Sequence, residues 1–229
     1  RLGDEGEALV LVDRDHRGDN QTFLVTRNLT PGRTFYNEPL FEFEEKEYRS
    51  WNPTRSKLAA AIMKGIENMP IKEGSMVLYL GVASGTTCSH VSDIVGDKGH
   101  IWALDFAPRS LRDLLDNLSR FRENISPILG DAHKPGSYSM LVPKVDVIFA
   151  DVAQPDQAEI MVKNADVFLD KGGWAMLSIK SRSIDVRMEP EKVFSMQTEV
   201  LEEGGLSVRE LIKLDPFEKD HAMAIAESE

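Results

Sequence analysis

The chain has 229 residues and a formal net charge of −11, with 27 lysines and arginines against 38 aspartates and glutamates. The length predicts one full domain with a small appendage, and 41% hydrophobic residues exclude wholesale disorder, while the apolar runs are too short for a membrane helix. The single cysteine, Cys88, excludes a disulfide framework and fits a reducing compartment, and the negative charge argues against broad nucleic-acid binding.

The first 49 residues differ from the rest of the chain. Short β-type runs at residues 9–12, 23–26 and 39–43 are separated by turn-rich stretches at 17–20 and 30–32. No titratable cluster of obvious chemical use accompanies them. We therefore predict a small N-terminal β domain of residues 1–49, whose role is packing or partner docking.

From Trp51 the pattern changes to alternating helices and strands. Asn52 and Pro53 predict the start of a helix that runs to about Met69. Continuous apolar runs, typical of buried parallel strands, follow at residues 76–80, 101–104, 125–129, 145–150 and 174–179. Helical patterns occur between and after them at 87–95, 109–121, 157–169 and 190–203, and two further strands are predicted at 207–214 and 222–226. This alternation predicts a doubly wound α/β sheet for a domain of residues 50–229.

The first predicted strand of that sheet ends in a loop of small residues, 81–87, which opens a helix. Small residues let a ligand approach the backbone, and a helix N-terminus offers free N–H groups. The loop lacks both the third glycine of a dinucleotide-binding motif and a phosphate-binding lysine. By itself it fits a plain tight turn as well as a ligand-binding loop.

Acidic residues end the strands that follow. Asp105 stands 24 positions after Gly81, about where an acid binds ribose hydroxyls in nucleotide-binding folds, and Phe106 beside it can stack on adenine. Asp131 follows the third strand and Asp151 the fourth. Because these strand ends share one edge of the sheet, we predict one adenosine-type cofactor site.

The identity of the cofactor is less sharply determined. NAD and S-adenosylmethionine both fit ribose-binding acids, and the missing third glycine favours S-adenosylmethionine, which has no phosphate. The loop nevertheless departs from the general methyltransferase pattern, since Tyr79 and Ala83 stand where an acid and a glycine are common.

Several long segments resemble one family. They are YRSWNPTRSKLA at 48–59, GVASGTTCSHVSDIV at 81–95, VDVIFADVAQPD at 145–156, IKSRSID at 179–185 and DHA at 220–222. Together they resemble fibrillarin, the ribose 2′-O-methyltransferase of box C/D guide-RNA particles, over nearly the whole chain from about residue 25. No Gly/Arg-rich tail is present, so the chain resembles the archaeal, cytoplasmic form rather than the nucleolar one.

The resemblance implies a specific site and specific partners. The cofactor would be S-adenosylmethionine, held near the loop by Gly81, Ala83, Thr86 and Thr87 and further along by Asp105, Phe106, Asp131, Ala132, Asp151, Val152, Ala153 and Gln154. The catalytic set would be Lys57, Asp151, Lys180 and His221. Implied partners are a box C/D guide RNA, target rRNA or tRNA, a Nop-family scaffold protein and a kink-turn-binding ribosomal-type protein. No metal is expected, because His16, His90, His100 and His133 show no ligand spacing.

Methyl transfer to a ribose hydroxyl requires that the hydroxyl be aligned and relieved of its proton. Lys180 is the candidate base and Lys57 a second cation near the hydroxyl. Asp151 opposes a base role because a nearby anion raises the pKa of a lysine, so we expect Asp151 chiefly to orient Lys180 and the methionine amino group. His221 would relay the proton or hold the ribose.

Three alternatives are disfavoured by the same residues. A magnesium-dependent small-molecule O-methyltransferase would need an Asp/Asn set in place of two lysines and a histidine, and a nicotinamide dehydrogenase would need the complete glycine motif. The intact Lys–Asp–Lys–His set argues against a ribonucleoprotein scaffold without activity. Basic residues around the predicted site favour an RNA substrate; they are Arg49, Arg55, Lys57, Lys180, Arg182 and Arg187. An acidic protein with one basic mouth would hold a target ribose weakly and would depend on partners for RNA affinity.

Overall fold

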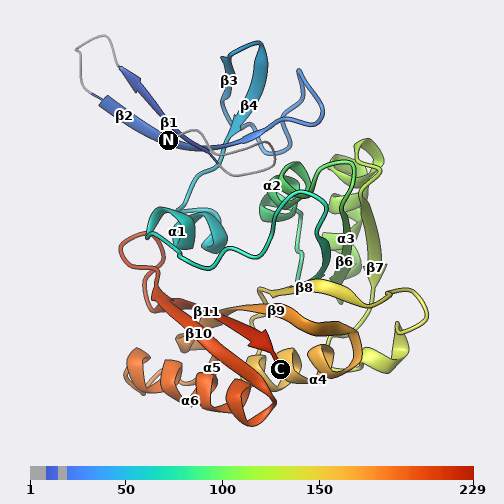
Figure 1. Ribbon diagram of the computed structural model, residues 1–229, viewed down its shortest axis with the longest axis vertical. Helices are drawn as coiled ribbons and strands as arrows, with labels where there is room; N and C mark the ends of the chain where they lie inside the picture. The colour runs from blue at the N-terminus through green and yellow to red at the C-terminus, as the bar shows by residue number, and fades with distance from the viewer. Residues whose placement is uncertain (1–8, 15–19) are drawn as a thin grey trace.

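The computed structural model describes the backbone of residues 9–14 and 20–229, and the side chains from residue 23 onward. It contains two β-sheets, one built from the N-terminal strands and one from the rest of the chain (Figure 1). His16 and most of the turn predicted at residues 17–20 lie outside the described residues.

The N-terminal sheet is antiparallel, with the strand order β1-β2-β4-β3. Its strands are β1 (Leu9–Arg14), β2 (Asn20–Arg27), β3 (Leu40–Phe43) and β4 (Lys46–Ser50). Strand β4 was not predicted, because the turn before it consists of Glu44 and Glu45, both at positive φ. Two-residue turns of this kind normally contain asparagine or glycine, so two glutamates conceal the hairpin.

The central sheet has seven strands in the order β10-β11-β9-β8-β5-β6-β7. The parallel part consists of β5 (Met76–Leu80), β6 (His100–Asp105), β7 (Ile125–Leu129), β8 (Val145–Ala150) and β9 (Leu169–Lys180). The last strands, β10 (Leu206–Lys213) and β11 (His221–Ser228), add to it in antiparallel fashion. The predicted doubly wound α/β fold is confirmed.

Helices cover both faces of the central sheet (Figure 1). One apolar cluster joins α1 (Lys57–Met63), α2 (Thr86–Val95) and α3 (Pro108–Asn117) to the first face, and a second joins α4 (Gln157–Phe168) and α6 (Pro190–Glu203) to the other. Short helical turns complete the structure: η1 (Ser119–Phe121), η2 (Pro135–Ser137) and α5 (Ser181–Ile184). The limits of α2, α4 and α6 agree with the predicted ones within a residue.

Helix α1 is shorter at both ends than predicted. The Asn52 side chain accepts a hydrogen bond from the Thr54 amide in a local turn, and the helix begins only after Ser56, whose Oγ accepts from the Ala59 amide. The helix ends before Gly65, which has a φ of +86°. Lys57 is therefore the first residue of α1, at the N-terminal end of the helix and near the rim of the sheet.

A buried charge network, made of Glu38, Arg49, Asp93 and Arg122, joins the N-terminal sheet to α2. The Arg49 Nε lies 2.6 Å from Glu38 Oε1, and its Nη1 lies 2.8 Å from Asp93 Oδ2. Arg122 approaches the other oxygen of Asp93 at 2.6 Å. Arg49 is fully buried, so the expectation that it belongs to a basic mouth is wrong: its charge is used inside the protein.

His90 on α2 also belongs to the interface between the N-terminal sheet and α2. Its Nδ1 lies 2.7 Å from Thr26 Oγ1 and its Nε2 2.5 Å from the Tyr36 hydroxyl, and the ring stacks on Trp51. Burial, together with the positive charges of Arg49 and Arg122, holds the pKa of His90 well below its ordinary value. His90 is therefore a neutral packing residue between the two sheets.

Candidate functional site

The carboxyl ends of β5, β6, β7 and β8 surround a cavity of about 600 Å³. This is the edge at which open α/β sheets bind ligands. Of the predicted cofactor residues, those in its lining are Gly81, Ala83, Asp105, Phe106, Asp131, Ala132, Asp151, Val152, Ala153 and Gln154. Lys180 lines the cavity as well, so the cofactor residues and one catalytic candidate share one space.

Thr86 and Thr87 do not line this cavity. They are the first residues of α2, and the Thr87 hydroxyl donates to Ser56 Oγ at 2.9 Å, which ties the start of α2 to the cap of α1. Thr86 borders a smaller cavity of about 200 Å³ beside Arg55 and Asp113. Their predicted contact with the cofactor therefore stays a prediction.

Asp105 holds the loop between β5 and α2 in place. Its Oδ2 accepts from the Ala83 amide and its Oδ1 from the Ala107 amide, both at 2.8 Å. These bonds support Ala83 in a left-handed conformation, with a φ of +51°, that costs a non-glycine residue energy. Each carboxylate oxygen has a further lone pair, so Asp105 can still accept hydrogen bonds from a ligand hydroxyl.

Position 81 requires a glycine, because of its backbone conformation and its close contact with Asp151. Its φ is +78°, and a Cβ at this position would lie 2.7 Å from the backbone oxygen of Asp151. We therefore predict that Gly81→Ala lowers the free energy of unfolding by about 2 kcal/mol or more, because strain and a backbone clash add.

Urea unfolding measures this effect, and Gly32→Ala is a useful control because it changes a positive-φ glycine with no atom within 4 Å. The control should show only the strain of the left-handed backbone. Equal losses in the two variants would contradict the argument from close contact.

His133 is a cavity residue that the sequence analysis missed. Its Nδ1 lies 2.8 Å from Asp131 Oδ1, and its Nε2 lies 3.2 Å from Asp156. The hydrogen bond to Asp131, with that to Asp156, raises the pKa of His133, and the bonds from His133 lower the pKa of Asp131. Its position in the sequence, directly after Asp131 and Ala132 at the end of a strand, could have indicated this role. The sequence analysis judged histidines only as metal ligands and therefore missed it.

The catalytic candidates meet beside the cavity. Asp151 lies between two lysines: Lys180 Nζ is 3.0 Å from Oδ1, and Lys57 Nζ is 3.4 Å from Oδ2. All three side chains are mostly buried, with 17–18% exposed. Three side chains from α1, the end of β8 and the end of β9 thus form one cluster with a net positive charge.

His221 lies beside Lys180 in the sheet. It is the first residue of β11 and pairs directly with Lys180 on β9, so the two side chains leave the same face. The His221 Nδ1 lies 2.7 Å from the carbonyl oxygen of Lys219. Because a carbonyl can only accept, Nδ1 carries the hydrogen, and Nε2 of the neutral ring has a free lone pair.

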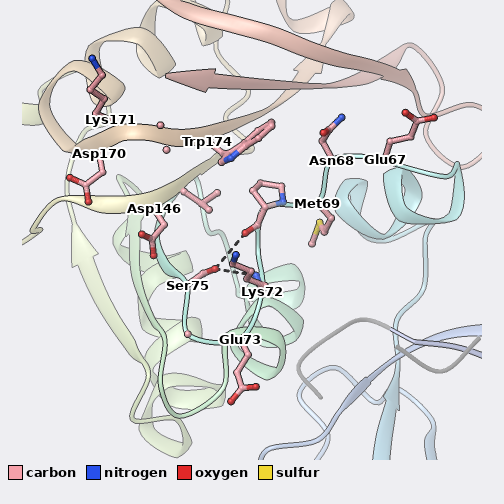
Figure 2. Close-up of a pocket in the computed structure, with 15 residues that line it drawn as sticks. Glu67, Asn68, Met69, Lys72, Glu73, Ser75, Asp146, Asp170, Lys171 and Trp174 are labelled. Atoms are coloured by element: carbon pink, nitrogen blue, oxygen red, sulfur yellow. Dashed lines mark hydrogen bonds between the residues drawn. The ribbon is translucent and has the colours of Figure 1, made fainter. Parts of the chain in front are cut away.

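A second cavity, of about 580 Å³, lies at the opposite edge of the sheet (Figure 2). Figure 2 shows Trp174 along its wall and Asp146, Asp170 and Glu73 around it, and Asp146 is already engaged by the Met76 amide at 2.8 Å. This edge carries the amino ends of the strands, whereas open α/β sheets bind their ligands at the carboxyl ends. Among the described residues, no cluster of three or more potential ligands is placed to hold a metal ion.

No helix in the described part of the chain is long and apolar enough to cross a bilayer.

The remaining basic candidates have different positions. Arg55 and Arg187 are exposed, and Arg55 lies over the Tyr36 ring at 4.9 Å, whereas Arg182 pairs with Asp220 at 2.9 Å. Arg55 lies two residues before Lys57, and Arg182 lies two residues after Lys180.

Comparison with known proteins identifies close relatives. The family model described as fibrillarin matches residues 10–229. A fibrillarin-like rRNA/tRNA 2′-O-methyltransferase of Methanocaldococcus jannaschii is 52% identical over 208 residues, which cover 91% of this chain and 90% of the relative.

Two solved structures are informative. The crystal structure of Aeropyrum pernix fibrillarin with natively bound S-adenosyl-L-methionine is 49% identical, with a TM-score of 0.88, and covers 98% of this chain and 96% of its own. A fibrillarin/Nop5p complex contains a chain that is 42% identical, with a TM-score of 0.82, and covers 90% of this chain and 94% of its own.

Proposed function

This chain belongs to the fibrillarin family, and from that premise we propose that it methylates ribose 2′-hydroxyls of rRNA and tRNA with S-adenosylmethionine, at sites selected by a box C/D guide RNA. The observation that carries the proposal is the cluster of Lys57, Asp151 and Lys180, of which Asp151 and Lys180 line the cavity. It combines an adenosine-type site with cations at the place where a ribose must enter.

The lining of the cavity fits S-adenosylmethionine. Asp105 would accept from the ribose hydroxyls of the cofactor, Phe106 would stack on its adenine, and Asp131 would accept from the adenine amino group. Asp151 pairs with Lys180 through Oδ1 and lines the cavity, so its carboxylate would also accept from the methionine ammonium group. The bound cofactor supplies a sulfonium methyl group, which is transferred by in-line displacement.

We assign different roles to the four catalytic candidates. Asp151 orients Lys180 and the ammonium group, while Lys180 and Lys57 hold the target ribose and its phosphate. The Lys180 Nζ is engaged by the Asp151 carboxylate at 3.0 Å, whereas His221 has its Nδ1 on the Lys219 carbonyl and its Nε2 available, which favours His221 Nε2 as the acceptor of the hydroxyl proton. Alignment by itself can supply about 7–11 kcal/mol in favourable cases, so a strong base is not required.

The family relation also supports the proposed partners. A relative forms a complex with Nop5p, so we propose a Nop-family scaffold for this chain, and with it a guide RNA and a kink-turn-binding ribosomal-type protein. RNA targets in an archaeal cell would place the enzyme in the cytoplasm, and the curated relatives are archaeal. The net charge of −11 fits an enzyme that depends on these partners to reach RNA.

We also propose the division of the chain into a β domain of residues 1–49 and a catalytic domain of residues 50–229. Two separate sheets support this division. Strand β4 crosses the boundary by one residue, and the buried charge network joins the two parts, so we expect them to unfold together.

The proposed function is tested by reconstitution. Calorimetry of the isolated chain should show metal-independent binding of S-adenosylmethionine. Mass mapping of 2′-O-methyl groups should show efficient modification only when a box C/D guide RNA and the scaffold proteins are present, at the paired nucleotide. Strict magnesium dependence with a small catechol-type acceptor, or site-selective methylation by the isolated chain, would contradict the proposal.

A further inference from the structure

Asp220, immediately before His221, is held in an unusual conformation. Its φ is +60°, in the left-handed region that aspartate adopts only at a cost. Three hydrogen bonds keep it there. The Ser181 amide and hydroxyl donate to the Asp220 carbonyl oxygen at 3.2 and 2.8 Å, and Arg182 Nε donates to Asp220 Oδ2 at 2.9 Å. We call Ser181, Arg182 and Asp220 the 181–220 clasp.

The 181–220 clasp begins directly after Lys180. Ser181 and Arg182 are the first residues of α5, and Lys180 pairs with His221 across β9 and β11. Arg182 also donates from Nη1 to the Val186 carbonyl oxygen at 2.8 Å, so one guanidinium ties the loop after α5 to Asp220. Planar arginine donors suit such a double contact, which lysine cannot reproduce.

The backbone turn at Asp220 places the Lys219 carbonyl oxygen at 2.7 Å from His221 Nδ1. The hydrogen bond at one ring nitrogen decides which nitrogen of a neutral histidine keeps the proton. Free neutral histidine prefers the hydrogen on Nε2, so the contact with Lys219 selects the opposite tautomer. Only this tautomer has an acceptor at Nε2.

We propose that Arg182, together with Ser181 and through Asp220, is a positioning residue that fixes the Nδ1–H tautomer of His221. Its catalytic meaning rests on the proposed function, in which His221 Nε2 receives the hydroxyl proton. The tautomer itself does not depend on that function. Without the clasp, the peptide between Lys219 and Asp220 is free to turn, and His221 loses the partner of Nδ1.

Long-range ¹H–¹⁵N NMR of the isolated chain, labelled at histidine and assigned with His221→Gln, tests the tautomer. We expect the Nδ1–H form in the wild type and a shift toward Nε2–H in Arg182→Ala. Asp220→Asn should keep the wild-type form, since asparagine accepts the same bond and tolerates positive φ. An Nε2–H wild type, or an unchanged Nδ1–H form in Arg182→Ala, would overturn the positioning role.

Turnover in the reconstituted particle gives a second measurement. We expect kcat to fall about tenfold or more in Arg182→Ala, with less than a twofold change in the dissociation constant of S-adenosylmethionine. Asp220→Asn should retain most of the wild-type kcat. Arg209→Ala is the matched control, because Arg209 pairs with Glu227 at 2.9 Å on the same strand pair. A shifted tautomer with unchanged kcat would support the clasp and overturn the proton-acceptor role of His221.

Discussion

Lys180→Ala should lower kcat for methyl transfer by about 10³-fold, while the dissociation constant for S-adenosylmethionine changes by less than about threefold. The Lys180 Nζ lies 3.0 Å from Asp151 and borders the cavity, where it reaches both the cofactor site and an entering ribose. Alanine removes the group that aligns the hydroxyl. Asp151 keeps Lys57 as its counter-ion at 3.4 Å, so the acid on the cofactor side remains in place.

Single-turnover assays in the reconstituted particle, combined with calorimetry of the cofactor, separate the two effects. Lys171→Ala is the matched control, because it removes one lysine at the second cavity, on the opposite edge of the sheet. Lys180→Arg keeps the charge but changes its geometry, and we expect it to recover only a small part of the activity. Full turnover in Lys180→Ala would remove Lys180 from the mechanism, and a large loss of cofactor affinity would make it a cofactor-binding residue.

The edge of the sheet that forms the cofactor cavity could be predicted because it depends on short, local sequence patterns. A continuous apolar run indicates a buried strand, and the acids after such runs must meet when the strands are parallel. Asp105, Asp131 and Asp151 follow from this rule, and all three line the cavity. The grouping of Lys57 and Lys180 came from the family resemblance, since nothing in their local sequence indicates that they share one carboxylate.

The features that could not be predicted depend on residues far away in the sequence. Arg49 looks like a surface cation until Glu38 and Asp93 are placed around it, and these lie 11 and 44 positions away. The turn at Glu44 and Glu45 follows the pairing of its flanking strands rather than local preference. The start of α1 depends on whether Asn52 or Ser56 caps the helix, and sequence patterns do not rank these two caps.

The second large effect is expected in stability. Asp93→Ala should lower the free energy of unfolding by about 3–5 kcal/mol, because it leaves the buried guanidinium of Arg122 without a counter-ion and deprives Arg49 of one of two. The carboxylate also accepts from the Thr26 hydroxyl at 2.8 Å and the Leu29 amide at 3.2 Å, so contacts between α2 and the N-terminal sheet are lost as well. Urea unfolding, followed by fluorescence and by circular dichroism, measures the change.

Two further variants separate charge burial from the simple loss of an ion pair. Glu191→Ala breaks the exposed pair with Lys213 and should change the free energy of unfolding far less than Asp93→Ala, because solvent screens an exposed ion pair. Asp93→Leu combined with Arg122→Met removes both partners of one buried pair and leaves Arg49 with Glu38, so it should be more stable than Asp93→Ala. If instead the double variant were the less stable one, unpaired charge would not be the cause, and the lost hydrogen bonds to Thr26 and Leu29 would have to account for the loss.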